Sequence, residues 1–120
     1  MIEIMSGLPE YVLGFKAKGK VTGKDYESVL IPAIEEKLKK HSKINLLYHL
    51  GKDCSGFDIE AMWDDTKIGM QHLTAWERIA FVTDIEWVRL TTKAFGFVMP
   101  GHVRVFANSQ LDEARGWVST

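Results

Sequence analysis

The stretch INLLYHL, residues 44–50, decides the fold of this chain. It is rich in aliphatic side chains and is bounded by Lys43 and Gly51, which is typical of a strand with both faces buried. A second run of this kind, Ile79–Val82, lies within residues 77–83. We therefore expect two buried strands in the middle of a sheet.

The residues between these two strands predict a loop followed by a helix. We expect the loop over Gly51–Gly56 and the helix from Asp58 onward, because apolar side chains there form one stripe and charged ones line the opposite side. A strand, a helix and another strand in this order predict a right-handed crossover and parallel pairing.

The residues before the central strand predict a hairpin and a helix. Residues 2–19 have the pattern of two strands joined by a turn over residues 6–9. The helix that follows can be capped by Thr22 or Asp25, and Pro32 predicts a bend within it.

The residues after the second buried strand complete the order. Residues 85–99 form a third helical stretch, residues 103–107 alternate as a strand, and Ser109 is the expected cap of a closing helix. The order β-β-α-β-α-β-α-β-α predicts one α/β domain over residues 1–120. Its five-stranded sheet should be mostly parallel, with one antiparallel edge and about four helices.

The composition limits the classes of function. The 120 residues carry 15 basic and 16 acidic side chains, a net charge of −1, so no overall field draws in nucleic acid or anionic lipid. Cys54 is the single cysteine, which fits a reducing compartment. We expect a cytoplasmic protein, because the chain shows neither a signal peptide nor about 18 consecutive apolar residues.

Several strings are similar to those of a known family. They are AMWDDTK at residues 61–67, ERIAFVTD at 77–84, VRVF at 103–106 and EARGW at 113–117. Together and in this order, the strings resemble the SpoIIAA-like family of small STAS-type domains. The resemblance implies a STAS-like fold, related in shape to the CRAL-TRIO lipid-carrier domains. It also implies a binding or regulatory role without established chemistry, so we expect no enzyme and no cofactor.

The resemblance also implies a modification site. In the anti-sigma-factor antagonists that share this fold, a serine in an Asp-Ser-Ser-Gly string at a helix N-terminus is phosphorylated by a partner kinase. Residues 53–56, DCSG, look like that string, with Ser55 at the position of the modified serine and Cys54 as a departure. Asp58 and Glu60 would repel a phosphate there. The alternatives are a phosphorylation-controlled protein–protein switch and a loop that caps the second helix.

The third helical stretch carries apolar side chains on more than one face. At about 100° per residue, one stripe forms from Val88, Thr91, Thr92, Phe95 and Met99, and a second from Trp87, Leu90, Ala94 and Phe97. This surplus predicts a surface that meets a bound ligand, a second subunit or a membrane whose headgroups face Arg89 and Lys93. The alternative is that neighbouring elements cover both faces.

Our leading hypothesis is a non-catalytic module that holds an apolar, amphipathic or lipid-like small molecule and touches the cytoplasmic membrane face through residues 85–99. Methionine and tryptophan on the second helix suit the other wall of such a pocket. Plain core packing is the alternative reading of that second-helix stripe. The predicted ligand-binding residues are Met62, Trp63, Met70, Trp87, Phe95, Phe97 and Met99.

Other chemistry has little support in the sequence. The four histidines lie in separate elements without metal-ligand spacing, so we expect no metal site. His49, near the end of the central strand, could pair with Cys54 or Ser55, although no orienting acid follows. The acidic residues Asp64 and Asp65 read as the solvated face of a helix, and no glycine-rich phosphate loop is present.

Overall fold

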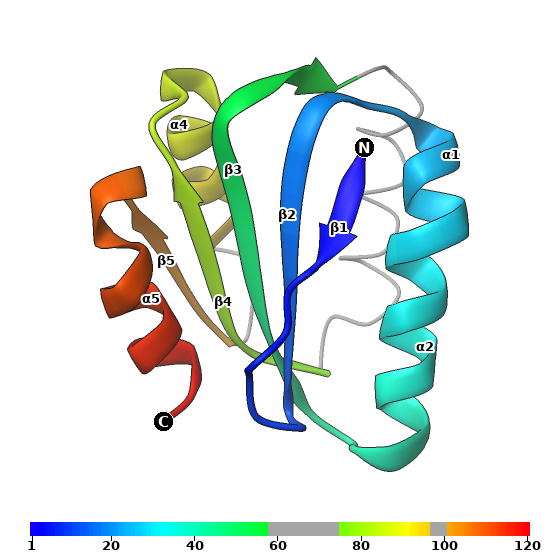
Figure 1. The fold of residues 1–120 in the computed structure, drawn as a ribbon. Coiled ribbons are helices and arrows are strands. Elements are labelled where there is room, and N and C mark those ends of the chain that lie inside the picture. The colour runs from blue at the N-terminus through cyan, green and yellow to red at the C-terminus, as the bar shows by residue number, and fades with distance from the viewer. Residues whose placement is uncertain (58–74, 97–100) are drawn as a thin grey trace.

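A computed structural model describes residues 1–57, 75–96 and 101–120 (Figure 1). One five-stranded sheet has the order β1-β2-β3-β4-β5. The strands are β1 (Ile2–Ile4), β2 (Val12–Val21), β3 (Ile44–Phe57), β4 (Trp76–Thr83) and β5 (His102–Phe106). β1 pairs antiparallel with β2, and all other pairs are parallel. The predicted α/β fold with one antiparallel edge is confirmed.

Helices cover the two faces of this sheet, which lies between α2 and α5 (Figure 1). The segment between β2 and β3 consists of α1 (Gly23–Asp25), a π-helical turn (Tyr26–Leu30) and α2 (Ile31–Lys40). Helix α4 (Glu86–Gly96) joins β4 to β5. The chain then forms a 3₁₀ turn (Asn108–Gln110) and α5 (Leu111–Val118). The helix predicted from Asp58 and the end of the third helical stretch fall at residues 58–74 and 97–100, outside the described residues.

The sheet has a hydrophobic core on each face. Alternate residues of a strand point to opposite faces, so Leu46 and Leu47 of β3 belong to different cores. Leu46 packs with residues of the α1–α2 segment and with Val88 of α4. Leu47 packs with Ala114 and Val118 of α5. The two-sided burial predicted for INLLYHL is confirmed, and it explains why the run does not alternate.

The first helical segment begins at a capping box. The Thr22 hydroxyl accepts a hydrogen bond from the Asp25 N–H at 3.2 Å, and Asp25 Oδ2 accepts one from the Thr22 N–H at 2.9 Å. The amino group of Met1 lies 3.2 Å from the same carboxylate oxygen. Burial alone raises the pKa of Asp25, but the bonds from Thr22 and the Met1 ammonium outweigh it and lower that pKa below 3.8.

The irregularity expected near Pro32 is a π-helical turn. The Ile31 N–H donates to the Tyr26 carbonyl, five residues earlier, immediately before the proline. Pro32 itself has no N–H to donate, so a widened turn next to it accommodates the break in the hydrogen-bond ladder.

Two local predictions are wrong. Residues 51–56 do not form a loop, because β3 continues to Phe57 beside the extended end of β2, where Cys54 pairs with Gly19 and Phe57 with Val21. The register shifts around Gly19, whose φ of +57° suits glycine. Ser109 does not cap the closing helix either. It lies inside the 3₁₀ turn, where Gln110 Oε1 accepts the Ala107 N–H at 2.9 Å instead.

Candidate functional site: the outer face of helix α4

Thr83, at the end of β4, fixes the start of helix α4. This buried threonine accepts a hydrogen bond at Oγ1 from the Ile85 N–H, at 3.1 Å. Its carbonyl accepts a second bond from Arg89 Nη1, at 2.9 Å. Both contacts tie the first turn of the helix to the sheet, so the direction in which the helix presents its side chains is set by β4.

The inner face of α4 packs on the sheet through a narrow line of residues. Val88 and Thr92, one turn apart, are only 6% and 7% exposed. Further along, Gly96 lies so close to β5 that a Cβ there would come within 3.3 Å of Val103 Cβ. Thr91, which the sequence placed in one stripe with Val88 and Thr92, is exposed. It lies about 100° around the helix from Thr92, on the outward side.

The outer face of α4 carries apolar side chains in water. Trp87 is 47% exposed and Leu90 is 60% exposed, and Ala94 one turn further on is exposed as well. The spacing of three and then four residues places all of them on one side of the helix. We call Trp87, Leu90 and Ala94 the α4 surface. The surplus of apolar side chains expected for this helix therefore exists among its described residues.

Lys93 is an exposed charged residue in this part of the helix. Arg89 is half-buried and its guanidinium is engaged with the Thr83 carbonyl. Lys93 is therefore better placed than Arg89 to meet an anionic group beside the α4 surface.

The structure places only part of the predicted ligand set. Trp87 is described and lies on the α4 surface. Phe95 lies on the same helix, but its side chain is not among those described. Outside the described residues are Met62, Trp63, Met70, Phe97 and Met99. Leu90, which is 60% exposed on the α4 surface, is missing from the predicted ligand set, although its spacing from Trp87 was the signal that could have included it.

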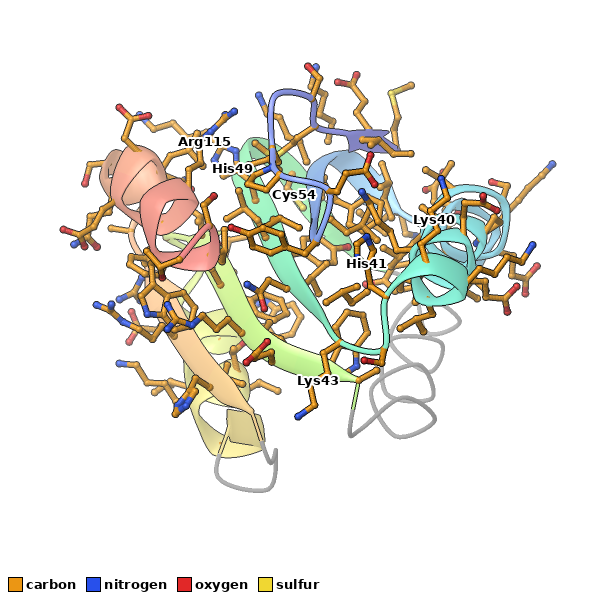
Figure 2. All side chains as sticks on the ribbon, turned by 90° about the horizontal axis from the view of Figure 1, so that it is seen from below. Lys40, His41, Lys43, His49, Cys54 and Arg115 are labelled. Atoms are coloured by element: carbon orange, nitrogen blue, oxygen red, sulfur yellow. The ribbon has the colours of Figure 1, made fainter. Side chains whose placement is uncertain are left out.

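His49 and Cys54, both labelled in Figure 2, belong to β3, and strand alternation does not bring them together as a pair. His49 has the same direction as Leu47, two residues before it, and therefore points to the face that α5 covers. Cys54 belongs to the core on the opposite face and is buried. Ser55 lies in the strand rather than in the expected loop, and its phosphorylation stays a prediction. In the described parts of the chain, no group of three His, Cys, Asp or Glu side chains could hold a metal ion.

The topology and the two cores define an α/β domain with a mostly parallel sheet covered by helices on both faces. The chain belongs to the SpoIIAA-like family, whose model matches residues 12–119. No curated protein matches the sequence.

A solved structure supports the same assignment. It is that of an uncharacterized protein with a SpoIIAA-like fold from Shewanella loihica PV-4. The two sequences are 27% identical, and the structures superpose with a TM-score of 0.75 over 98% of this chain and 92% of the other. The resemblance noted in the sequence is thereby confirmed, and the family suggests a regulatory module rather than an enzyme. No helix within the described ranges is long and apolar enough to cross a bilayer.

Proposed function

We propose that this protein is a non-catalytic regulatory module that binds an apolar or lipid-like partner through the α4 surface and associates peripherally with a membrane. One observation carries the proposal: Trp87 and Leu90 stand side by side in water on a helix whose opposite face is buried. Two neighbouring large apolar side chains that remain this exposed support a binding function.

The chemistry of the pair fits the boundary between water and lipid. An indole ring has an apolar body and an N–H donor, and for this reason tryptophan favours the level of the lipid headgroups. Leucine adds apolar area that can reach the acyl chains, and Lys93 can meet an anionic headgroup from the same helix.

The strength of such a contact is limited by its size. Complete removal of a large apolar side chain from water is worth roughly 1.5–3 kcal/mol, and these two are already about half covered. We therefore expect weak and reversible membrane association, in which a soluble protein shifts between free and bound states.

Vesicle flotation tests this proposal with a matched pair of variants. Leu90→Asp places a charge on the α4 surface, whereas Ile4→Asp makes the same change at a residue that is 57% exposed on β1, at the opposite edge of the sheet. With vesicles of phosphatidylcholine and phosphatidylglycerol, wild type and Ile4→Asp should float and Leu90→Asp should remain in solution. Flotation of all three proteins, or of none, would contradict the proposal.

Native mass spectrometry of protein purified from its own cells tests the bound-ligand part. A lipid-like mass should accompany the wild-type protein and be reduced in Leu90→Asp. If only the bare chain is detected, the small-molecule part of the proposal fails, while the flotation result still decides the membrane part.

A further inference from the structure

Strand β5 is the outermost strand of the sheet, next to β4. Within the described ranges, no strand pairs with its outer edge (Figure 1). A strand in this position presents a row of backbone N–H and C=O groups that a further strand could bond. The side chains of β5 decide which further strand that could be.

The two faces of β5 differ in chemistry. Val103 and Val105 are half-buried, and Val103 packs with the core beneath α4. His102 and Arg104 alternate with them and are exposed on the other face. A partner strand that follows the same pleat would therefore meet aliphatic side chains on one side and the imidazole of His102 and the guanidinium of Arg104 on the other.

The closing helix leaves the basic face of β5 uncovered because it is held over the neighbouring strands. Asn45 of β3 donates to the Val118 carbonyl at 2.6 Å, and Arg78 of β4 donates to the Trp117 carbonyl at 2.9 Å. On β5 itself, Phe106 packs against the closing helix with its ring 6.0 Å from that of Trp117, and Arg104 extends over the same tryptophan while staying exposed.

Aromatic rings hold the cations on this face. The Arg104 guanidinium lies 4.7 Å from the ring centre of Phe106 and 5.4 Å from that of Trp117. Arg78 approaches the same tryptophan at 5.3 Å. Arg78 already donates from Nη1 to the Trp117 carbonyl, whereas stacking orients the Arg104 guanidinium and leaves its N–H groups available for hydrogen bonds. Among the described residues, no carboxylate forms an ion pair with Arg104 or Arg78.

We propose that the outer edge of β5 binds an extended acidic segment of a partner protein as a sixth strand. Backbone hydrogen bonds to the strand edge provide affinity for the segment. Its specificity comes from carboxylates opposite Arg104 and from aliphatic side chains beside Val103 and Val105. A second copy of the chain fits poorly, because it would bring another Arg104 toward the same basic face. The proposal is independent of the α4 surface.

A peptide titration tests the charge selection. The probe is a fluorescein-labelled, capped peptide that alternates valine and glutamate, and a matched peptide carries lysine in place of glutamate. Fluorescence anisotropy should show that Arg104→Glu weakens binding of the acidic peptide by about tenfold or more and creates binding of the lysine peptide. Lys40→Glu, the same charge change at the end of α2, should leave both affinities within about twofold.

The gain of lysine-peptide binding would also show that the Arg104→Glu protein is folded. Equal weakening by Arg104→Glu and Lys40→Glu would overturn the proposal, since the attraction would then come from overall charge.

A second peptide tests the backbone pairing. Methylation of alternate peptide nitrogens keeps the acidic side chains but removes the N–H groups that a sixth strand would donate. Strand addition predicts that this peptide loses most of its affinity. An N-methylated peptide that binds as tightly as its parent would contradict addition to the β5 edge.

Discussion

The side chain of Asn45 donates a hydrogen bond from Nδ2 to the carbonyl oxygen of Val118 at 2.6 Å, and this bond joins the central strand to the closing helix. Its Oδ1 accepts the Arg78 N–H of β4 at 3.0 Å. Asn45 is only 3% exposed. One buried amide therefore holds three elements together where the β3–β4 ladder shifts its register after Ile44.

Replacement of Asn45 should lower the stability of the whole domain. Asn45→Ala leaves the Val118 carbonyl and the Arg78 N–H without this partner, which should cost about 2–4 kcal/mol in the free energy of unfolding, measured with urea. Asn108→Ala is the matched control, because Asn108 Oδ1 is buried without a hydrogen-bond partner. Equal losses in the two variants would show that the Asn45 bonds contribute little.

The capping box at Thr22 predicts a dependence on pH. The lowered pKa of Asp25 means that folding stabilises the ionised carboxylate relative to the protonated acid. Its contribution to stability is therefore present above pH 3.8, the ordinary pKa, and is lost as the pH falls through the lower pKa of the folded state. Urea unfolding should show Asp25→Asn less stable than wild type at neutral pH, with a smaller difference in acid.

Glu27→Gln is the control for this pH experiment. It removes one negative charge from an exposed position in the π-helical turn that follows α1. Its stability relative to wild type should change less with pH than that of Asp25→Asn. A constant difference between Asp25→Asn and wild type across the acid range would contradict the assigned role of the carboxylate.

Two glycines offer a test of backbone packing. A Cβ at Gly101 would lie 2.4 Å from the Trp76 carbonyl oxygen and 2.8 Å from that of Glu77, so Gly101→Ala must displace backbone at the start of β5. We expect a loss of about 1–3 kcal/mol. A Cβ at Gly116 of α5 meets nothing within 4 Å. Gly116→Ala should therefore stabilise the protein by roughly 0.4–1 kcal/mol. The melting temperature should fall in Gly101→Ala and rise in Gly116→Ala relative to wild type.

The two faces of α4 should respond differently to truncation. Val88→Ala removes buried methyl groups and should cost about 1–3 kcal/mol of stability. Leu90→Ala shortens a side chain that is mostly in water and should change stability by less than about 0.5 kcal/mol. The free energies of unfolding of both variants, measured by chemical denaturation, test this difference. A large loss for Leu90→Ala would mean that this residue serves the fold rather than a partner.

The fold could be predicted where the pattern of hydrophobic residues is local. Ile44–Leu50 lacks alternation because both faces of β3 are buried, and that is visible in the sequence. The extension of β3 to Phe57 was not visible, because it depends on pairing with the far end of β2 across the shift at Gly19. Glycine and serine in residues 51–56 have turn chemistry, and only the neighbouring strand overrides it.

One of the two candidate sites could be predicted from a local pattern, and the other could not. The exposure of Trp87 and Leu90 follows from helical spacing alone, because one buried stripe cannot take every apolar residue of the stretch. The basic edge at Arg104 could not be foreseen, although the alternation of residues 103–107 was. Whether a strand is central or outermost depends on the order of the sheet, and no local pattern states that order.

The close approach of Gly96 to Val103 has a mechanical consequence for the molecule. At Gly96 the backbone of the last turn of α4 rests directly on the side chain of Val103 in the outermost strand, because glycine adds no side chain of its own. Close-packed atoms transmit small shifts rather than damping them. A shift of β5 on binding a partner should therefore displace the end of α4 as well.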